Sequence, residues 1–106
     1  MAKKKRPEKL NNVLDKVKAS IACGNYRLTS HALDRQTERA INLPETLHVL
    51  KTGFEEKAKT SFDEQQNTWK YAIRGKTIRD TLDVRVIIAF DENEMLIITV
   101  MYIGQV

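Results

Sequence analysis

The segment from Asp83 to Ile103 constrains the fold more than any other part of the chain. Two apolar runs rich in β-branched residues flank the polar stretch 91–94, and this pattern is typical of a β-hairpin. Strands this apolar need cover on at least one side, because an exposed face of Ile, Val, Leu and Phe would promote aggregation. The first half of the chain, which we expect to be helical, provides that cover.

The polar loop also predicts how the two strands pair. With residues 91–94 in the loop, the paired residues are Phe90 with Met95, Arg85 with Val100, and Asp83 with Tyr102. This register predicts that Arg85 and Tyr102 project from one face at the open end of the hairpin.

The segments before the hairpin begin with helices. Apolar residues recur at helical spacing, and each group is bounded by residues that favour helix ends. The boundaries are Glu8 and Gly24 for the first helix, Ser30 as N-cap of a second helix over 31–40, and Asn42 with Pro44 at the start of a third helix that ends at Gly53.

Strands and turns follow the helices. The predicted pieces are an edge strand within 25–29, a strand over 54–62, a turn over 63–67, a strand over 68–74 and a basic loop over 75–81. Helices followed by consecutive strands indicate an α+β fold, with the N-terminal helices packed on an antiparallel sheet. A chain of 106 residues supplies apolar material for one core. We therefore predict a flexible basic tail over 1–7 and a single domain over 8–106.

Charge and cysteine content narrow the classes of partner and compartment. The formal net charge is +4, and four basic residues lie in the tail, so the rest of the chain is near neutral overall. Within it, acidic residues concentrate over 54–66 and basic residues over 67–86. Cys23 is the only cysteine, so an intrachain disulfide is excluded and a reducing, cytoplasmic location is expected. No apolar run is long enough to span a membrane.

Several catalytic classes lack their motifs. One cysteine and two distant histidines make no zinc signature, so we predict neither a metal site nor a cofactor. Gly75-Lys76-Thr77 imitates the end of a phosphate-binding loop, but Lys70 stands where that motif requires its first glycine. No Gly-x-Ser-x-Gly element indicates a serine hydrolase.

The most informative polar pattern lies on the second predicted helix. His31, Arg35 and Arg39 recur every four residues and therefore form a stripe along one helix face. An imidazole that titrates near neutrality beside two guanidinium groups suits the binding of a phosphodiester with proton transfer next to it. The alternative is a solvated face, in which Asp34 and Glu38 neutralise the arginines.

Other candidate side chains have a structural alternative as well. His48 suits a packed or half-exposed structural role, and Tyr102 suits the end of the core. Trp69 and Tyr71 share a strand face and suit the core, although Trp69 also offers a stacking surface for a nucleobase.

The sequence resembles a family of small bacterial domains of unknown function. The similarity covers roughly residues 25–104, and the motif that opens the second helix is His31-Ala32-x-x-Arg35-x-x-Glu38-Arg39. The further motifs are Ile-x-Leu-Pro, a Val-Leu-x-x-Gly ending, Tyr-x-Ile-x-Gly-Lys and a closing Ile-Ile-Thr-Val-x-Tyr, and Gln36 stands where many such sequences have an apolar residue.

That family is similar to the RelE-like ribonuclease toxins and to the barnase, EndoU, colicin and RelE-type fold group. The resemblance implies helices on one face of an antiparallel sheet and a concave opposite face that carries basic residues for RNA.

These observations lead to the hypothesis of a metal-independent endoribonuclease of the toxin type, which cleaves mRNA or tRNA by attack of the ribose 2′-hydroxyl on the neighbouring phosphate. The candidate catalytic residues are His31, Arg35, Arg85 and Tyr102, and the candidate RNA-binding residues are Arg39, Lys70, Arg74, Lys76 and Arg79. The expected partners are RNA and an antitoxin protein. The alternative is a non-catalytic module with the same fold that binds RNA or a protein.

Overall fold

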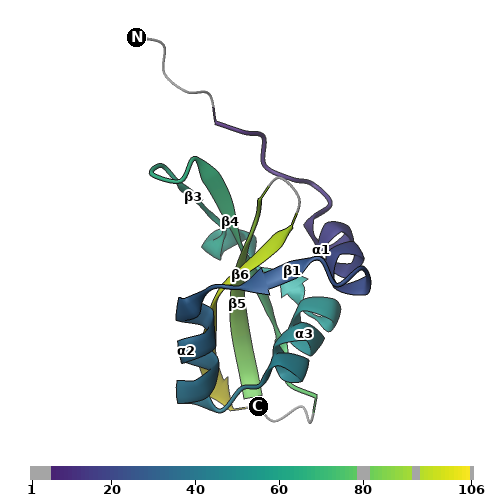
Figure 1. The fold of residues 1–106 in the computed structure, drawn as a ribbon, viewed down its shortest axis with the longest axis vertical. Helices are drawn as coiled ribbons and strands as arrows, with labels where there is room; N and C mark the ends of the chain where they lie inside the picture. Colours follow the sequence, from purple (N-terminus) through teal and green to yellow (C-terminus); the bar gives the residue numbers. More distant parts are fainter. Residues whose placement is uncertain (1–5, 79–81, 92–93, 106) are drawn as a thin grey trace.

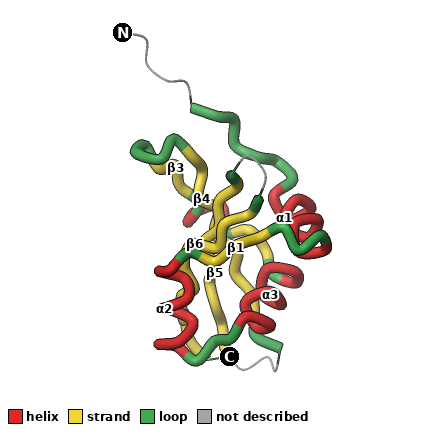
Figure 2. Tube along the Cα trace, viewed as in Figure 1, coloured by secondary structure: helices red, strands yellow, loops and turns green. Residues whose placement is uncertain are grey.

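Three α-helices lie on one face of a six-stranded sheet in the computed structural model, which describes residues 6–78, 82–91 and 94–105 (Figure 1 and Figure 2). In chain order the elements are α1 (Val13–Ala22), β1 (Tyr26–Leu28), α2 (Ser30–Arg39), α3 (Leu43–Thr52), β2 (Phe54–Glu55), the short 3-10 helix η1 (Lys57–Lys59), β3 (Ser61–Asp63), β4 (Thr68–Lys76), β5 (Leu82–Phe90) and β6 (Met95–Gln105). The α+β class is therefore confirmed.

The sheet is mixed, whereas the sequence indicated an antiparallel one. Its strand order is β1-β6-β5-β4-β2, and β3 pairs with the outer half of β4. The central pairs are antiparallel, but β1 runs parallel to β6, with Tyr26 beside Met95 and Leu28 beside Ile97. The predicted edge strand within 25–29 is present; because two helices separate it from the other strands, its direction was not evident from the order of elements.

One apolar core joins the three helices to the sheet. Alternate residues of β4, β5 and β6 are buried beneath the helices, while α2 packs on β6, α3 packs on β4 and β5, and α1 packs on α3. The buried members are Val13, Val17, Ala32, Ile41, Val49, Leu50, Tyr71, Ile73, Val84, Val86, Ile88, Met95, Ile97 and Val100. Within the residues that the structure describes, no α-helix lies over the opposite face of the central strands.

The helix boundaries agree with the sequence in part. Gly24 follows α1 with φ +67°, and α3 begins after Asn42, whose side chain accepts a hydrogen bond from the Glu45 N–H, and ends before Gly53. The first helix begins at Val13 and not at Glu8. The preceding segment is instead held on the sheet, because Tyr71 Oη accepts a hydrogen bond from the Leu10 N–H (2.9 Å).

Register in the β5–β6 hairpin differs from the predicted one beyond the first pairs. Phe90 pairs with Met95 as expected, and pairing continues in step to Ile88 with Ile97. β6 then contains an extra residue, Ile98, and this bulge shifts the pairs that follow by one residue. A second irregularity, at Ile103, shifts the last pairs once more. The resulting pairs are Arg85 with Met101, Val84 with Tyr102, and Asp83 with Gly104.

Thr29 links this bulge to the start of α2. Its hydroxyl accepts a hydrogen bond from the Ala32 N–H (3.2 Å) and donates one to the carbonyl of Ile98 (3.0 Å). Thr29 is therefore the N-cap of α2, and Ser30, the predicted cap, is the first helical residue. The extended backbone of Thr29, which continues the direction of β1, places its side chain between the helix and the bulge.

Two glycines allow the end of α3 to approach β4 closely. A Cβ on Gly53 would lie 2.6 Å from the carbonyl oxygen of Val49 and would also overlap the carbonyl of Arg74. A Cβ on Gly75 would lie 3.0 Å from the Cα of Gly53. The chain therefore passes directly from α3 into β2 against β4. The predicted strand over 54–62 is in fact β2 and β3 with η1 between them.

Candidate functional site

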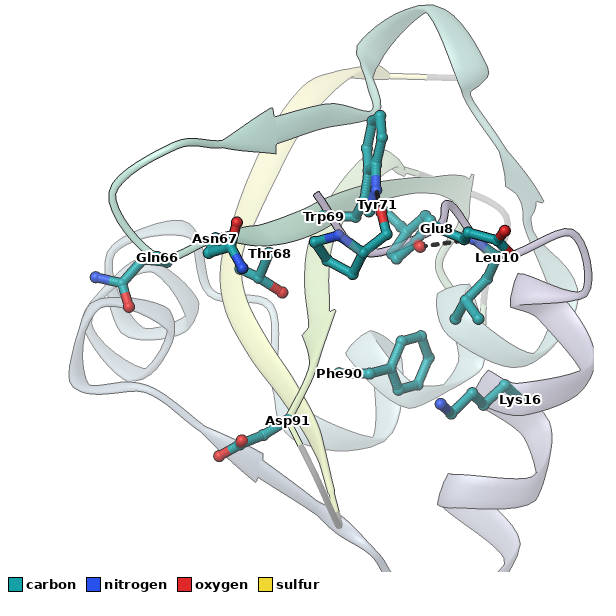
Figure 3. Close-up of a pocket in the computed structure, with 11 residues that line it drawn as sticks. Glu8, Leu10, Lys16, Gln66, Asn67, Thr68, Trp69, Tyr71, Phe90 and Asp91 are labelled. Carbon is teal, nitrogen blue, oxygen red and sulfur yellow. Dashed lines mark hydrogen bonds between the residues drawn. The ribbon is translucent and has the colours of Figure 1, made fainter. Parts of the chain in front are cut away.

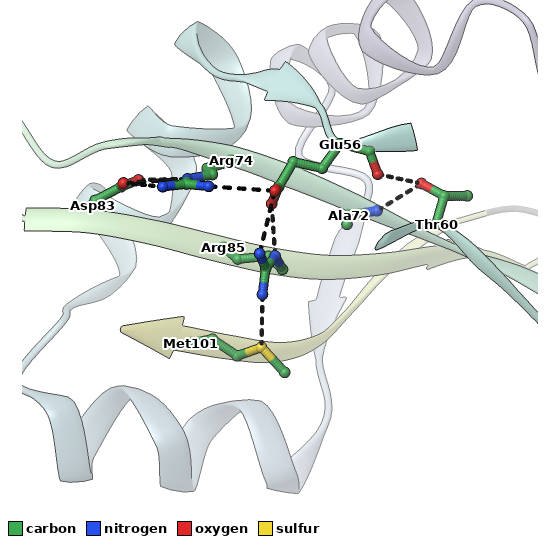
Figure 4. Close-up of polar contacts among 7 residues, drawn as sticks. All are labelled: Glu56, Thr60, Ala72, Arg74, Asp83, Arg85 and Met101. Carbon is green, nitrogen blue, oxygen red and sulfur yellow. Dashed lines mark hydrogen bonds and ion pairs between the residues drawn. The ribbon is translucent and has the colours of Figure 1, made fainter. Parts of the chain in front are cut away.

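Two arginines meet on the sheet face opposite the helices. Arg74 of β4 and Arg85 of β5 are cross-strand partners. Glu56, in the turn between β2 and η1, lies against both, with Oε1 2.6 Å from Arg85 Nε, and Oε2 3.2 Å from Arg85 Nη2 and 3.4 Å from Arg74 Nη1 (Figure 4). Asp83 holds Arg74 from the other side, at 2.6 Å from Oδ2 to Nη2. We call these four residues the arginine network.

The local sequence explains the position of each member. Val84 and Val86 alternate with Arg85, so burial of the valines directs the arginine to the opposite face. Glu56 is fixed to β4, because its N–H donates to the carbonyl of Ala72 (2.8 Å). The Thr60 hydroxyl donates to the carbonyl of Glu56 (3.3 Å) and accepts from the Ala72 N–H (3.2 Å), which holds the same turn in place (Figure 4).

Hydrogen bonds keep both carboxylates of the arginine network ionised. The hydrogen bonds from Arg85 lower the pKa of Glu56 against the opposing effect of desolvation, and Arg74 adds to this lowering. The hydrogen bonds from Arg74 lower the pKa of Asp83 in the same way, and the pKa of Arg74 is raised in return. Two guanidinium groups thus face two carboxylates, so an anionic ligand has to replace a carboxylate as partner of an arginine.

A cavity of about 500 Å³ adjoins the arginine network at the β2 edge of the sheet. It shares Arg74 and Asp83 with the network, and it adds His48 from α3, Lys76 from β4 and the aromatic ring of Phe54. Phe54 is 57% exposed, which is unusual for a ring of this size. An imidazole, two cationic side chains and a stacking surface therefore lie around one opening, which we call the His48 cavity.

The structure brings together some of the site residues expected from sequence. Arg74, Arg85 and Lys76 lie at the arginine network or in the His48 cavity. Lys70, on the same face, instead pairs with Asp63 at 2.8 Å from Nζ to Oδ2. Arg79 lies outside the described residues.

The stripe on α2 lies apart from the arginine network. His31 is exposed, Arg35 pairs with Glu38 (2.5 Å from Nη1 to Oε2), and Arg39 donates to the carbonyl of Val100 (3.5 Å). Among the described residues, no hydrogen bond or ion pair joins this stripe to Arg74 or Arg85.

Tyr102 does not project beside Arg85, contrary to the prediction. It pairs with Val84, whose side chain is buried on the helix face, so Tyr102 belongs to that face while Arg85 belongs to the opposite one. The bulge at Ile98 is the cause, because one extra residue reverses the side to which residues 99–102 of β6 point, before the second register shift at Ile103.

Sequence reasoning missed Glu56 and undervalued His48. Glu56 belongs to the acidic stretch 54–66, and the basic stretch 67–86 follows it. Two consecutive strands of opposite charge are expected to pair, and this signal could have indicated a carboxylate beside the arginines. The position of His48 depends on the close approach of α3 to β4, which no local pattern reveals.

The part of the chain that the structure describes contains neither a cluster of metal ligands nor a membrane-spanning helix. There, no group of three or more His, Cys, Asp or Glu residues is arranged to hold a metal ion. No helix of the described residues has the length and apolar character needed to cross a membrane.

A family model described as a domain of unknown function (DUF4258) matches residues 28–102, from the end of β1 to Tyr102 in β6. The match includes α2, α3 and every member of the arginine network, and it leaves out α1. No curated protein and no solved structure matches the chain.

Proposed function

The chain belongs to the family described as a domain of unknown function (DUF4258), and we propose that it is a metal-independent endoribonuclease whose active site is the arginine network with the His48 cavity. The observation that carries this proposal is the carboxylate of Glu56 held between Arg74 and Arg85 on the sheet face opposite the helices. The reaction is attack of a ribose 2′-hydroxyl on its own phosphate, which requires a base, an acid and positive charge at the phosphate.

Arg74 and Arg85 are the candidate phosphate-binding groups. A guanidinium forms two parallel hydrogen bonds with phosphate as readily as with carboxylate, so a phosphodiester at the arginine network replaces Glu56 as partner of Arg85. That exchange leaves the Glu56 carboxylate beside the bound phosphate without its hydrogen bonds from Arg85. Because those hydrogen bonds lower the pKa of Glu56, their loss raises its basicity.

Glu56 is then the candidate base and His48 the candidate acid. A carboxylate next to the phosphate accepts the proton of the 2′-hydroxyl, and an imidazolium at the opening of the same site donates a proton to the departing 5′-oxygen. Lys76 and Arg74 supply positive charge at the His48 cavity. The assignment made from sequence, with His31, Arg35 and Tyr102 in the catalytic roles, remains a competing prediction on another surface.

The direct test measures cleavage of a fluorophore-labelled oligoribonucleotide in the presence of EDTA. We expect cleavage by the unmodified chain, a 2′,3′-cyclic phosphate product, and a loss of about a hundredfold or more for Glu56→Gln and for Arg85→Gln. A matched control is Arg35→Gln, which removes a guanidinium from α2 and is expected to retain activity. Equal cleavage by all of these variants contradicts the proposed site.

A non-catalytic RNA-binding module is the second candidate. The observation that favours it is the pairing of both arginines with carboxylates, which also suits a purely structural network. It predicts RNA binding that weakens steeply with salt, without a cleavage product.

We also propose a cytoplasmic location, since the single cysteine, Cys23, is free and exposed. We further propose that an inhibitory protein partner binds over the arginine network.

A further inference from the structure

A second cavity lies between the N-terminal segment, the beginning of α1, the start of β4 and the end of β5 (Figure 3). Its volume is about 350 Å³, within the range of small-molecule sites. Among the described residues, the side chains that line it are different from those of the His48 cavity. The proposed ribonuclease activity makes no use of it.

Aromatic rings form the walls of this cavity, and hydrogen bonds fix two of them. Trp69 donates from Nε1 to the carbonyl of Pro7 (2.8 Å), and Tyr71 Oη accepts from the Leu10 N–H (2.9 Å). The rings of Tyr71 and Phe90 lie 6.1 Å apart at a tilt of 56°. Rings that are already fixed lose little conformational freedom when a planar ligand stacks on them.

Polar groups along the cavity suit the edges of a nucleobase. Because the Tyr71 hydroxyl accepts from Leu10, its own proton remains to be donated, and burial raises the pKa of Tyr71 so that this proton is kept. Asn67 also lines the cavity, and its amide offers both a donor and an acceptor. Nucleobases present the same combination on their edges.

Charged groups around the rings suit a ribose and its phosphate. The ammonium of Lys16 lies 4.7 Å from the centre of the Phe90 ring, and that of Lys9 lies 5.6 Å from the centre of the Trp69 ring. Glu8 also lines the cavity and adds a carboxylate beside the rings. Carboxylates accept hydrogen bonds from ribose hydroxyls, while an ammonium attracts a phosphate.

We infer that this aromatic cavity binds a ribonucleoside unit, with the base stacked against Trp69 and Phe90, its edge at the Tyr71 hydroxyl, and the ribose directed toward the Glu8 carboxylate. The bound unit is either a free nucleoside or nucleotide, or one residue of an RNA chain. Both present the same base and ribose to the cavity.

Trp69 provides the measurement, because it is the only tryptophan of the chain and lines the cavity. We expect its fluorescence to change saturably when the full chain is titrated with adenosine or uridine, and more weakly with 2′-deoxyadenosine. AMP is expected to bind more tightly than adenosine, with Lys16→Gln removing that difference. The absence of any saturable change with all four compounds overturns the inference.

Two variants test the location. Phe90→Leu removes a stacking ring and is expected to weaken binding about tenfold. Asn67→Gly removes an amide while suiting the backbone, since Asn67 has φ +52°, and it is expected to weaken binding with the thermal midpoint retained. The control is Phe54→Leu, which alters the His48 cavity only. If both cavity variants bind as the unmodified chain does, or if Phe54→Leu weakens binding equally, the site is wrongly placed.

The source is distinguished with hexa-adenylate in the Glu56→Gln background, in which the proposed cleavage does not consume the ligand. Tighter binding of hexa-adenylate than of AMP identifies RNA as the source, whereas weaker binding identifies the free nucleotide. Because the readout is binding, failure of the proposed ribonuclease activity does not affect this result.

Discussion

Glu56 and Arg85 form a two-point ion pair on the sheet face opposite the helices, with 2.6 Å from Oε1 to Nε and 3.2 Å from Oε2 to Nη2. The side chains are 14% and 16% exposed, so neither is freely hydrated. Arg85 is thereby held in a defined orientation beside Arg74, which gives the face a preorganised pair of guanidinium groups.

Stability is expected to depend on this pair. Glu56→Gln removes the charge that compensates Arg85 and should lower the free energy of unfolding by about 1–3 kcal/mol, because a half-buried charged group loses its partner. Urea denaturation followed by circular dichroism measures this change. The control is Glu38→Gln in the exposed Arg35–Glu38 pair, where we expect a change within about 0.5 kcal/mol. Equal midpoints for both variants would show that the network contributes no stability.

Acid should destabilise the protein through the same carboxylates. The folded-state pKa values of Glu56 and Asp83 lie below the ordinary values of 4.5 and 3.8, so the folded state binds fewer protons than the unfolded state in this range. The stability from these groups is fully present above those ordinary values and is lost as the pH falls through the lower folded values. Urea midpoints measured from pH 7 to about pH 2.5 test this. Asp83→Asn should flatten the acid side of the profile.

Activity should distinguish the two histidines. His48 lines the cavity next to Arg74, whereas His31 is exposed on α2. His48→Ala is expected to reduce kcat for oligoribonucleotide cleavage by about a hundredfold or more, and His31→Ala to leave it nearly unchanged. The opposite result, a loss for His31→Ala alone, would move the catalytic centre to α2 and support the assignment made from sequence.

The contact between α3 and β4 should tolerate no side chain at residue 53. Gly53→Ala places a methyl group against the carbonyls of Val49 and Arg74, and we expect the free energy of unfolding to fall by about 1–3 kcal/mol or more. Gly104→Ala is the matched control, because a Cβ there has no atom within 4 Å. Thermal unfolding of the two variants measures the difference. A Gly53→Ala protein as stable as the control would mean that this approach is looser than the structure shows.

Local patterns in the sequence were sufficient for most of the fold. Helical spacing with Asn42 and Gly53 predicted α3 correctly, and the alternation of Trp69, Tyr71 and Ile73 predicted the buried face of β4. These features depend on neighbours within a few residues, so the printed sequence contains their cause. The direction of β1 depends instead on pairing with β6, nearly 70 residues later, and no local pattern encodes it.

Of the candidate site, only the positively charged side chains were predictable from the sequence. Arg74 and Arg85 follow from strand alternation, but their partner Glu56 lies 29 residues before Arg85 and reaches it through a turn that Thr60 fixes on β4. The helical stripe of His31, Arg35 and Arg39 has the expected spacing, yet spacing within a helix gives no information about what the helix faces. Convergence between elements is a property of packing, and packing decided the location of His48 as well.

The extra residue Ile98 in β6 reverses the face of the sheet to which the side chains of residues 99–102 point. As a result, Met101 and not Tyr102 lies on the face of the arginine network. Met101 Sδ lies 4.0 Å from Arg85 Nη1. A slip of one residue in this strand would exchange Met101 and Tyr102. The hydroxyl of Thr29 donates a hydrogen bond to the carbonyl of Ile98 and so favours the arrangement with the bulge. This threonine at the start of α2 thereby helps to determine which side chain of β6 lies beside Arg85.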